Sequence, residues 1–228
     1  TATNLAAILQ MPLSRLWLAL RGVRLGWPEL IGISVLILYL ALVPFIARTW
    51  RATGDEPHYL LTAHSLVVDG DFDLANNYEN LDYLNFYFSK DINRQIVTNR
   101  AGQQILNHQL GYPLLIAPAY ALGGRPGVLF FQAALGGLLA MLTYRLALHL
   151  SGSQPASLLA TLLVAVSPPL MMYSYLVYPE LAGALLTTFI LYLALTRKKP
   201  SARLAAAVVV SLAMLPWLNR RFLPLARL

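Results

Sequence analysis

The stretch PELIGISVLILYLALVPFIAR (residues 28–48) decides the fold class, because it is apolar over nearly the length that a membrane-spanning helix needs. About 20 such residues cross the hydrocarbon core of a bilayer as a helix. Pro28 suits a first helical turn, where its missing N–H costs no hydrogen bond. The sequence therefore predicts a first transmembrane helix over residues 28–48.

The composition of the whole chain agrees with an integral membrane protein. Of the 228 residues, 57% are hydrophobic and 12% are charged, whereas a soluble domain carries about a quarter charged residues. Cysteine is absent, which excludes disulfides and thiolate metal sites. Four further apolar stretches predict four more spans, at residues 127–149, 155–174, 178–196 and 203–218. We therefore expect an all-α integral membrane fold with about five transmembrane helices.

The charges are separated along the chain in the way that membrane topology produces. The net charge is +7, yet residues 52–112 hold eight acidic and three basic residues. Arg197, Lys198 and Lys199 follow the fourth expected span. Because cytoplasmic loops carry the excess of Lys and Arg, we expect a cytoplasmic N-terminus and an extracytoplasmic segment over residues 49–126, in a bacterial cytoplasmic membrane. The basic excess is then an orientation signal, so membrane lipids are expected partners and nucleic acid is not.

Four regions follow from this pattern. Residues 1–27 carry arginines at roughly helical spacing among apolar residues, which predicts a cytoplasmic interfacial amphipathic helix or, equally, an ordinary basic tail. Residues 28–48 are the first transmembrane helix, residues 49–126 the extracytoplasmic loop, and residues 127–228 a four-helix transmembrane region.

The long loop is expected to contain helices of its own. Residues 56–68 have apolar side chains at helical spacing and predict a helix along the membrane surface. Residues 111–124 are apolar but too short for a span, and Pro113 and Pro118 break them. They predict an interfacial or re-entrant element.

An acidic pair, Asp55-Glu56, opens the helix predicted for residues 56–68. Carboxylates beside hydrocarbon are costly, so their presence indicates a functional site by default. Asp55 would be a general base that deprotonates an acceptor hydroxyl, with Glu56 supporting it or holding a metal. The alternative is that the pair only begins a helix, with Asp55 as its N-cap and Glu56 in the first turn. Both can hold together.

Other candidate residues fall on the same side of the expected membrane. Glu180 is either a first-turn acid that the helix dipole favours or a second acidic wall facing Asp55. Arg220 and Arg221 lie outside, against the charge rule. They are either anion-binding residues for a lipid-carrier phosphate or anchors at the membrane interface.

Metal sites are weakly indicated. His58 and His64 are six residues apart, which is poor spacing for one helical face, so a zinc site with Asp55 gains little support. The segment Asp69–Asp73 alternates acids but lacks the Gly and Glu that an EF-hand loop requires. A turn with Asx hydrogen bonds is the default for it. We assign no metal ligand, and we leave the cofactor open, with a divalent metal ion among the candidates.

The layout of these motifs resembles the lipid-phosphosugar-dependent membrane glycosyltransferases of the GT-C class, in the protein O-mannosyltransferase and aminoarabinose-transferase branch. That branch begins its first outer loop with an Asp-Glu pair, then a Tyr, then a stretch like Ala63–Asp71. Here the pair is Asp55-Glu56 and the tyrosine is Tyr59. Asn107–Leu114 looks like the His-Lys-Pro-Pro-Leu element of the branch, without its Lys and its first Pro.

The resemblance implies a function and its residues. Asp55 would be the catalytic base and Glu56 a supporting acid, and the donor would be a polyprenyl-phosphate sugar. The expected substrate-binding residues are Tyr59, His58, Asp71, His108, Glu180, Arg220 and Arg221. The chain would transfer a sugar to an acceptor at the extracytoplasmic face.

One departure leaves an alternative open. The resemblance implies about a dozen spans, the number typical of this class of enzymes. The sequence of this chain predicts about five. It would then be the N-terminal part of a longer enzyme or a shortened, inactive homologue. An inactive homologue would act as an accessory structural subunit among other membrane protein subunits.

Overall fold

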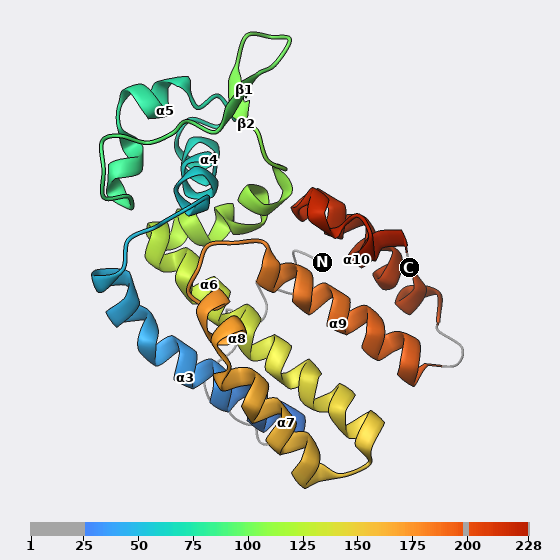
Figure 1. Cartoon of the computed structure of the whole chain (residues 1–228). Helices are drawn as coiled ribbons and strands as arrows, with labels where there is room; N and C mark the ends of the chain where they lie inside the picture. Colours follow the sequence, from blue (N-terminus) through green and yellow to red (C-terminus); the bar gives the residue numbers. More distant parts are fainter. Residues whose placement is uncertain (1–25, 198–200, 228) are drawn as a thin grey trace, which may run out of the picture.

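The computed structural model describes residues 26–197 and 201–227, and it is mostly helical, at 73% (Figure 1). The amphipathic segment expected over residues 1–27 lies almost wholly outside the described residues. The helices are α3 (Trp27–Thr49), α4 (Glu56–Val68), α5 (Ala75–Glu79), α6 (Gly111–Ser151), α7 (Gln154–Val166), α8 (Pro168–Tyr173), α9 (Glu180–Thr196) and α10 (Ala202–Leu218). Short 3-10 turns are η1 (Asp82–Asn85), η2 (Arg220–Phe222) and η3 (Leu225–Arg227), and one hairpin joins β1 (Ile96–Thr98) to β2 (Gln104–Leu106).

The longest helix, α6, is the centre of the fold. It packs against α3, α4, α7 and α9. Glycines let α3 come close, because a Cβ on Gly137 would stand only 2.8 Å from the Cβ of Leu36. The helix bends where Gly123 and Gly124 leave helical φ and ψ angles, a conformation that glycine adopts at little cost.

Within residues 26–197 and 201–227, two helices, α3 and α6, are long and apolar enough to cross a membrane. The expectation of five full-length spans finds no such support. Helix α7 has 13 residues and α9 and α10 have 17 each, so they rise about 20 to 26 Å against a hydrocarbon core of about 30 Å. Pro168 and Pro169 explain the short α7, because the chain breaks before them and restarts as α8.

The polar end of the molecule is formed by α4, α5, η1 and the β1–β2 hairpin, which Figure 1 shows grouped beyond one end of the long helices. Helix α4 has the bounds that the sequence predicts, Glu56 to Val68. Its first two turns are buried on every side, so it is covered by protein there rather than lying open along a surface.

The element expected over residues 111–124 is the first part of α6, and it is continuous helix up to the bend at Gly123. The prediction that Pro113 and Pro118 break it is wrong. Pro113 lies in the first turn, where no intrahelical N–H bond is lost, and the helix accommodates Pro118. The break falls instead at the two glycines.

Candidate functional site

Six of the residues singled out by sequence meet at one small pocket in the polar end. The pocket measures about 30 Å³, room for about two water molecules. Helix α4, the base of the hairpin, the α8–α9 connection and η2 contribute to its wall. It is lined by Asp55, Tyr59, His108, Tyr178, Glu180, Asn219, Arg220 and Arg221.

Asp55 is positioned by a tight contact with Tyr178. The backbone N–H of Asp55 donates to the Tyr178 hydroxyl at 3.1 Å, and that hydroxyl donates to the Thr53 carbonyl at 3.3 Å. Gly54 makes this approach feasible, because it has φ +57° and a Cβ there would collide with the Tyr178 hydroxyl. The turn therefore needs glycine for both its backbone angle and its lack of a side chain.

The Asp55 carboxylate does not cap α4. The structure gives the N-cap position to Asp55 without a side-chain capping bond. Instead Oδ1 accepts a hydrogen bond from Gln95 Nε2 at 2.8 Å, and Oδ2 lies 3.9 Å from His108 Nε2. The capping interpretation of Asp55 is wrong, and its carboxylate is directed to the pocket residues.

Glu56 behaves differently from its neighbour, because it is 1% exposed and lies outside the pocket wall. Its carboxylate accepts the backbone N–H of Val177 at 2.7 Å and that of Thr53 at 2.9 Å. Burial raises the pKa of Glu56, and these two bonds partly oppose that rise. Glu56 thus joins the start of α4 to the α8–α9 connection, a structural contact that the sequence pattern did not reveal.

The α8–α9 connection is held from a second side by Gln132 of α6. Its amide nitrogen donates to the carbonyl of Leu176 at 2.7 Å and to that of Tyr178 at 3.2 Å. Gln132 is fully buried. Together with Glu56 it fixes the segment that brings Tyr178 and Glu180 to the pocket.

Tyr59 and His108 form the aromatic wall of the pocket. The Tyr59 ring centroid lies 5.7 Å from that of His108 and 5.2 Å from that of Tyr112. Burial raises the pKa of Tyr59, so its hydroxyl stays protonated. Burial lowers the pKa of His108, and Arg220 and Arg221 lower it further, against the opposite effect of Asp55.

The two arginines come to the pocket through η2. The backbone N–H of Arg220 donates to Gln109 Oε1, and that of Arg221 donates to Asn219 Oδ1, each at 3.0 Å. Gly111 admits the end of α10, because a Cβ there would collide with Trp217. These contacts use only backbone atoms, and both arginines are exposed, so their guanidinium groups are accessible to an anion from solvent.

Besides Glu56, two predicted site residues, His58 and Asp71, lie outside the pocket wall. His58 Nδ1 bonds the Tyr78 hydroxyl at 2.8 Å. Burial lowers the pKa of His58 to about 4, so the ring is neutral at pH 7. Asp71 accepts from Ser65 Oγ at 3.0 Å and from the backbone of Asp73 at 3.0 Å. The turn expected for this acidic segment is confirmed.

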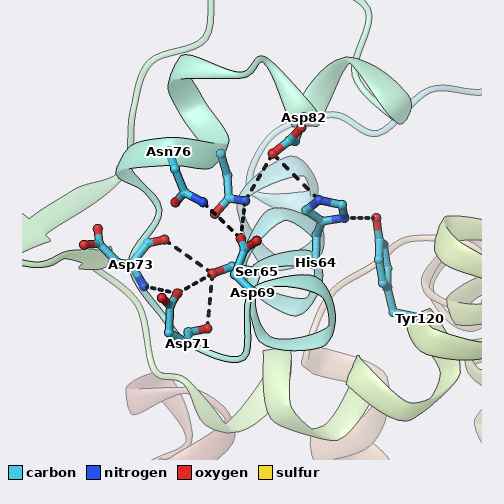
Figure 2. A network of polar contacts seen from close by, with 9 residues as sticks. His64, Ser65, Asp69, Asp71, Asp73, Asn76, Asp82 and Tyr120 are labelled. Carbon is cyan, nitrogen blue, oxygen red and sulfur yellow. Dashed lines mark hydrogen bonds and ion pairs between the residues drawn. The ribbon is translucent and has the colours of Figure 1, made fainter.

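Figure 2 shows that the acidic turn belongs to a structural network. Asp69 accepts from the amide groups of Asn76 and Asn77, and Asp82 accepts from Asn77. His64 lies between Asp82, at 3.7 Å, and the Tyr120 hydroxyl, at 3.1 Å. The network ties α4, α5 and η1 to α6. Across the described residues, no group of three or more His, Asp or Glu side chains is arranged to hold a metal ion.

Three residues of the site were not singled out by sequence. Gln95 and Asn219 carry no motif. Only folding brings Gln95 to Asp55, whereas Asn219 is the N-cap of η2 and accepts the nearby backbone N–H of Arg221. Tyr178 stands two residues before Glu180, but nothing in the sequence indicates its contact with the backbone of Asp55. Comparison of the chain with protein-family models, with curated proteins and with solved structures finds no match. The geometry of the pocket is therefore the main evidence on function.

Proposed function

We propose that the chain carries the acceptor-side part of a GT-C-type glycosyltransferase site that uses a polyprenyl-phosphate sugar. The observation that carries the proposal is the meeting of Asp55 with His108, Glu180, Arg220 and Arg221 at one pocket. These residues come from segments far apart in the sequence. A carboxylate beside guanidinium groups suits a reaction in which a base and an anionic leaving group act together.

The proposed reaction is a single displacement. The acceptor hydroxyl oxygen attacks the anomeric carbon of the sugar, and Asp55 takes the hydroxyl proton. The bond between the anomeric carbon and the phosphate oxygen breaks, and its electron pair leaves with the polyprenyl phosphate. Because attack comes from the face opposite to the leaving group, the configuration at the anomeric carbon inverts.

The arginines would bind the donor phosphate with the same contacts before and during transfer. Guanidinium groups bind phosphate through paired hydrogen bonds, and both Arg220 and Arg221 are exposed at the pocket rim. The pocket of about 30 Å³ admits no whole sugar. Donor binding therefore requires η2 to move away from α4, or the sugar to lie above the rim.

The Arg221→Ala variant is expected to raise the KM for the donor about tenfold while kcat changes little, because one phosphate contact is lost in the ground state and the transition state alike. Steady-state transfer in proteoliposomes with varied donor concentration measures this. Arg48→Ala is the matched control, since Arg48 is also exposed, at the end of α3 nearest the site. An equal rise in both variants would contradict a specific role for Arg221.

We further propose that α3 and α6 cross a bacterial cytoplasmic membrane, with the N-terminus cytoplasmic and the polar end extracytoplasmic. The shorter apolar helices α7 to α10 would lie in the same bilayer, with local thinning or protein neighbours making up their length. The net acidity of residues 52–112 against the basic remainder supports this orientation.

Single-cysteine labelling tests the orientation cleanly, because the chain contains no native cysteine. Arg100→Cys at the hairpin tip is expected to react with a membrane-impermeant maleimide in intact cells. Gln154→Cys at the start of α7 is expected to react only after the cells are opened. Both positions are exposed, so accessibility within the fold does not bias the comparison. The reverse pattern would refute the orientation.

A second candidate function is an inactive accessory subunit of a larger membrane complex. The pocket volume, about 30 Å³, favours it, because that space is too small for a sugar. This alternative predicts co-purification with other membrane proteins and no transfer by the isolated chain. A divalent metal ion stays an open candidate cofactor, for which no role is assigned.

A further inference from the structure

Gln95 lies between the proposed base and His108. Its amide nitrogen donates to Asp55 Oδ1 at 2.8 Å, and its amide oxygen bonds His108 Nε2. Asp55 Oδ2 and His108 Nε2 are themselves 3.9 Å apart, beyond hydrogen-bond distance. The amide is therefore the direct link between the two side chains.

The register of the β1–β2 hairpin places Gln95 between Asp55 and His108. Ile96 pairs with Leu106, and the backbone N–H of Asn107 donates to the Gln95 carbonyl at 3.0 Å. This pairing sets Gln95 beside His108, although the two residues are 13 apart in sequence. Asn99 closes the tip by accepting the N–H groups of Ala101 and Gln103. The hairpin thus delivers a fixed amide to the pocket.

The chemistry of the three groups fixes the hydrogen positions. An ionised carboxylate only accepts hydrogen bonds, so the amide NH₂ must face Asp55. The amide oxygen then faces His108 and only accepts, so His108 Nε2 must carry a hydrogen. A neutral imidazole has one N–H. Neutral His108 is therefore the Nε2–H tautomer, with Nδ1 bare.

The charged and titratable neighbours of His108 agree with a neutral ring. Asp55 faces it through Gln95, the Tyr59 ring packs against it, and the arginines of η2 lie across the pocket, with Tyr178 and Glu180 in the same wall. Burial and the two arginines lower the pKa of His108, although Asp55 opposes them. The positive partner of the phosphate is thus arginine rather than histidine.

We propose that Gln95 is a positioning residue, which holds one oxygen of Asp55 and fixes His108 as the Nε2–H tautomer. The other oxygen, Oδ2, is then the one left to take the acceptor proton; this last step alone rests on the proposed transfer function. Gln95 touches neither substrate in this scheme and acts through Asp55 and His108.

The tautomer is measured by NMR on the protein in nanodiscs with ¹⁵N-labelled histidine. The chain has four histidines, and a His108→Gln variant assigns the His108 signals. Wild type is expected to show Nε2–H for His108 at pH 7.5. Gln95→Ala is expected to give a mixture of tautomers. Gln95→Glu is expected to raise the His108 proton affinity about tenfold or more, because it adds a carboxylate beside the ring.

Gln103→Ala is the matched control, since it is the same change in the same hairpin and its side chain bonds Asn99 instead. It should leave the His108 tautomer as in wild type. A Gln95→Ala protein that keeps the wild-type tautomer would overturn the proposal. This measurement needs no activity, so a chain that transfers no sugar defeats the proposed function without deciding the role of Gln95.

If the wild-type protein transfers sugar, steady-state kinetics give a second test of the positioning role of Gln95. Gln95→Ala is expected to lower kcat about 10²-fold while the KM for the donor stays within about twofold, because the base is misplaced and the arginines are untouched. Gln103→Ala should transfer at the wild-type rate. Unchanged kcat in Gln95→Ala would overturn the positioning role.

Discussion

The Asp55→Asn variant is expected to lose sugar transfer by a factor of about 10² to 10⁴, the range that general-base catalysis contributes. Asn keeps the size of the side chain and can still accept from Gln95 Nε2, so the pocket should persist. It cannot take up the proton of the acceptor hydroxyl. Transfer of labelled sugar in proteoliposomes, with unfolding temperature as the check on folding, measures the effect.

Asp91→Asn is the matched control for this loss. Asp91 is an exposed acid in the same polar segment, away from the pocket wall. Its variant should transfer at the wild-type rate. If Asp55→Asn retained full activity, Asp55 would not be the base. The comparison requires that the wild-type protein transfers sugar. A wild-type protein without transfer activity would favour the accessory-subunit alternative.

The Glu56→Ala variant is expected to lose about 3 kcal/mol of unfolding free energy or more. The change leaves the buried backbone N–H of Val177 and the partly buried one of Thr53 without their charged acceptor. Hydrogen bonds to charged groups contribute about 1.5–3 kcal/mol each. The raised pKa of Glu56 reduces the net loss, because burying its charge is itself unfavourable. Thermal unfolding in detergent measures the difference.

Glu79→Ala is the control for Glu56→Ala. Glu79 ends α5 and is exposed, so its removal should change stability by less than about 0.5 kcal/mol. Comparable stability in both variants would show that the Glu56 carboxylate does not hold the α8–α9 connection. We therefore expect different effects from the two adjacent acids. Replacing Asp55 lowers the transfer rate, and replacing Glu56 lowers the free energy of unfolding.

The parts of the site that sequence could predict depended on topology. Counting apolar stretches placed Asp55, Glu180 and Arg221 at one end of the molecule, and the structure brings them to one pocket. Helical spacing also gave the bounds of α4. The count of apolar stretches and the helical spacing are both local properties of the sequence. They can therefore be read without knowledge of tertiary contacts.

The parts that sequence missed depend on single long-range contacts. Whether an acid beside a membrane helix faces a pocket or a backbone N–H is decided by its rotamer, and Asp55 and Glu56 look alike in sequence. Gln95 needs the hairpin register before it has a neighbour at all. The end of α7, by contrast, has a local signal in the sequence, the Pro168-Pro169 pair.

The dispersed origin of the pocket wall has a consequence for biosynthesis. Tyr178 is translated 123 residues after the Asp55 that it contacts, and Arg221 comes later still. At about 5–20 residues per second, Asp55 waits about 6 to 25 s for Tyr178. During that interval Asp55 has the wall residues Tyr59 and His108 but lacks those from Tyr178 onwards. Nascent chains should therefore gain donor affinity abruptly, once α10 and η2 have been inserted, rather than by degrees.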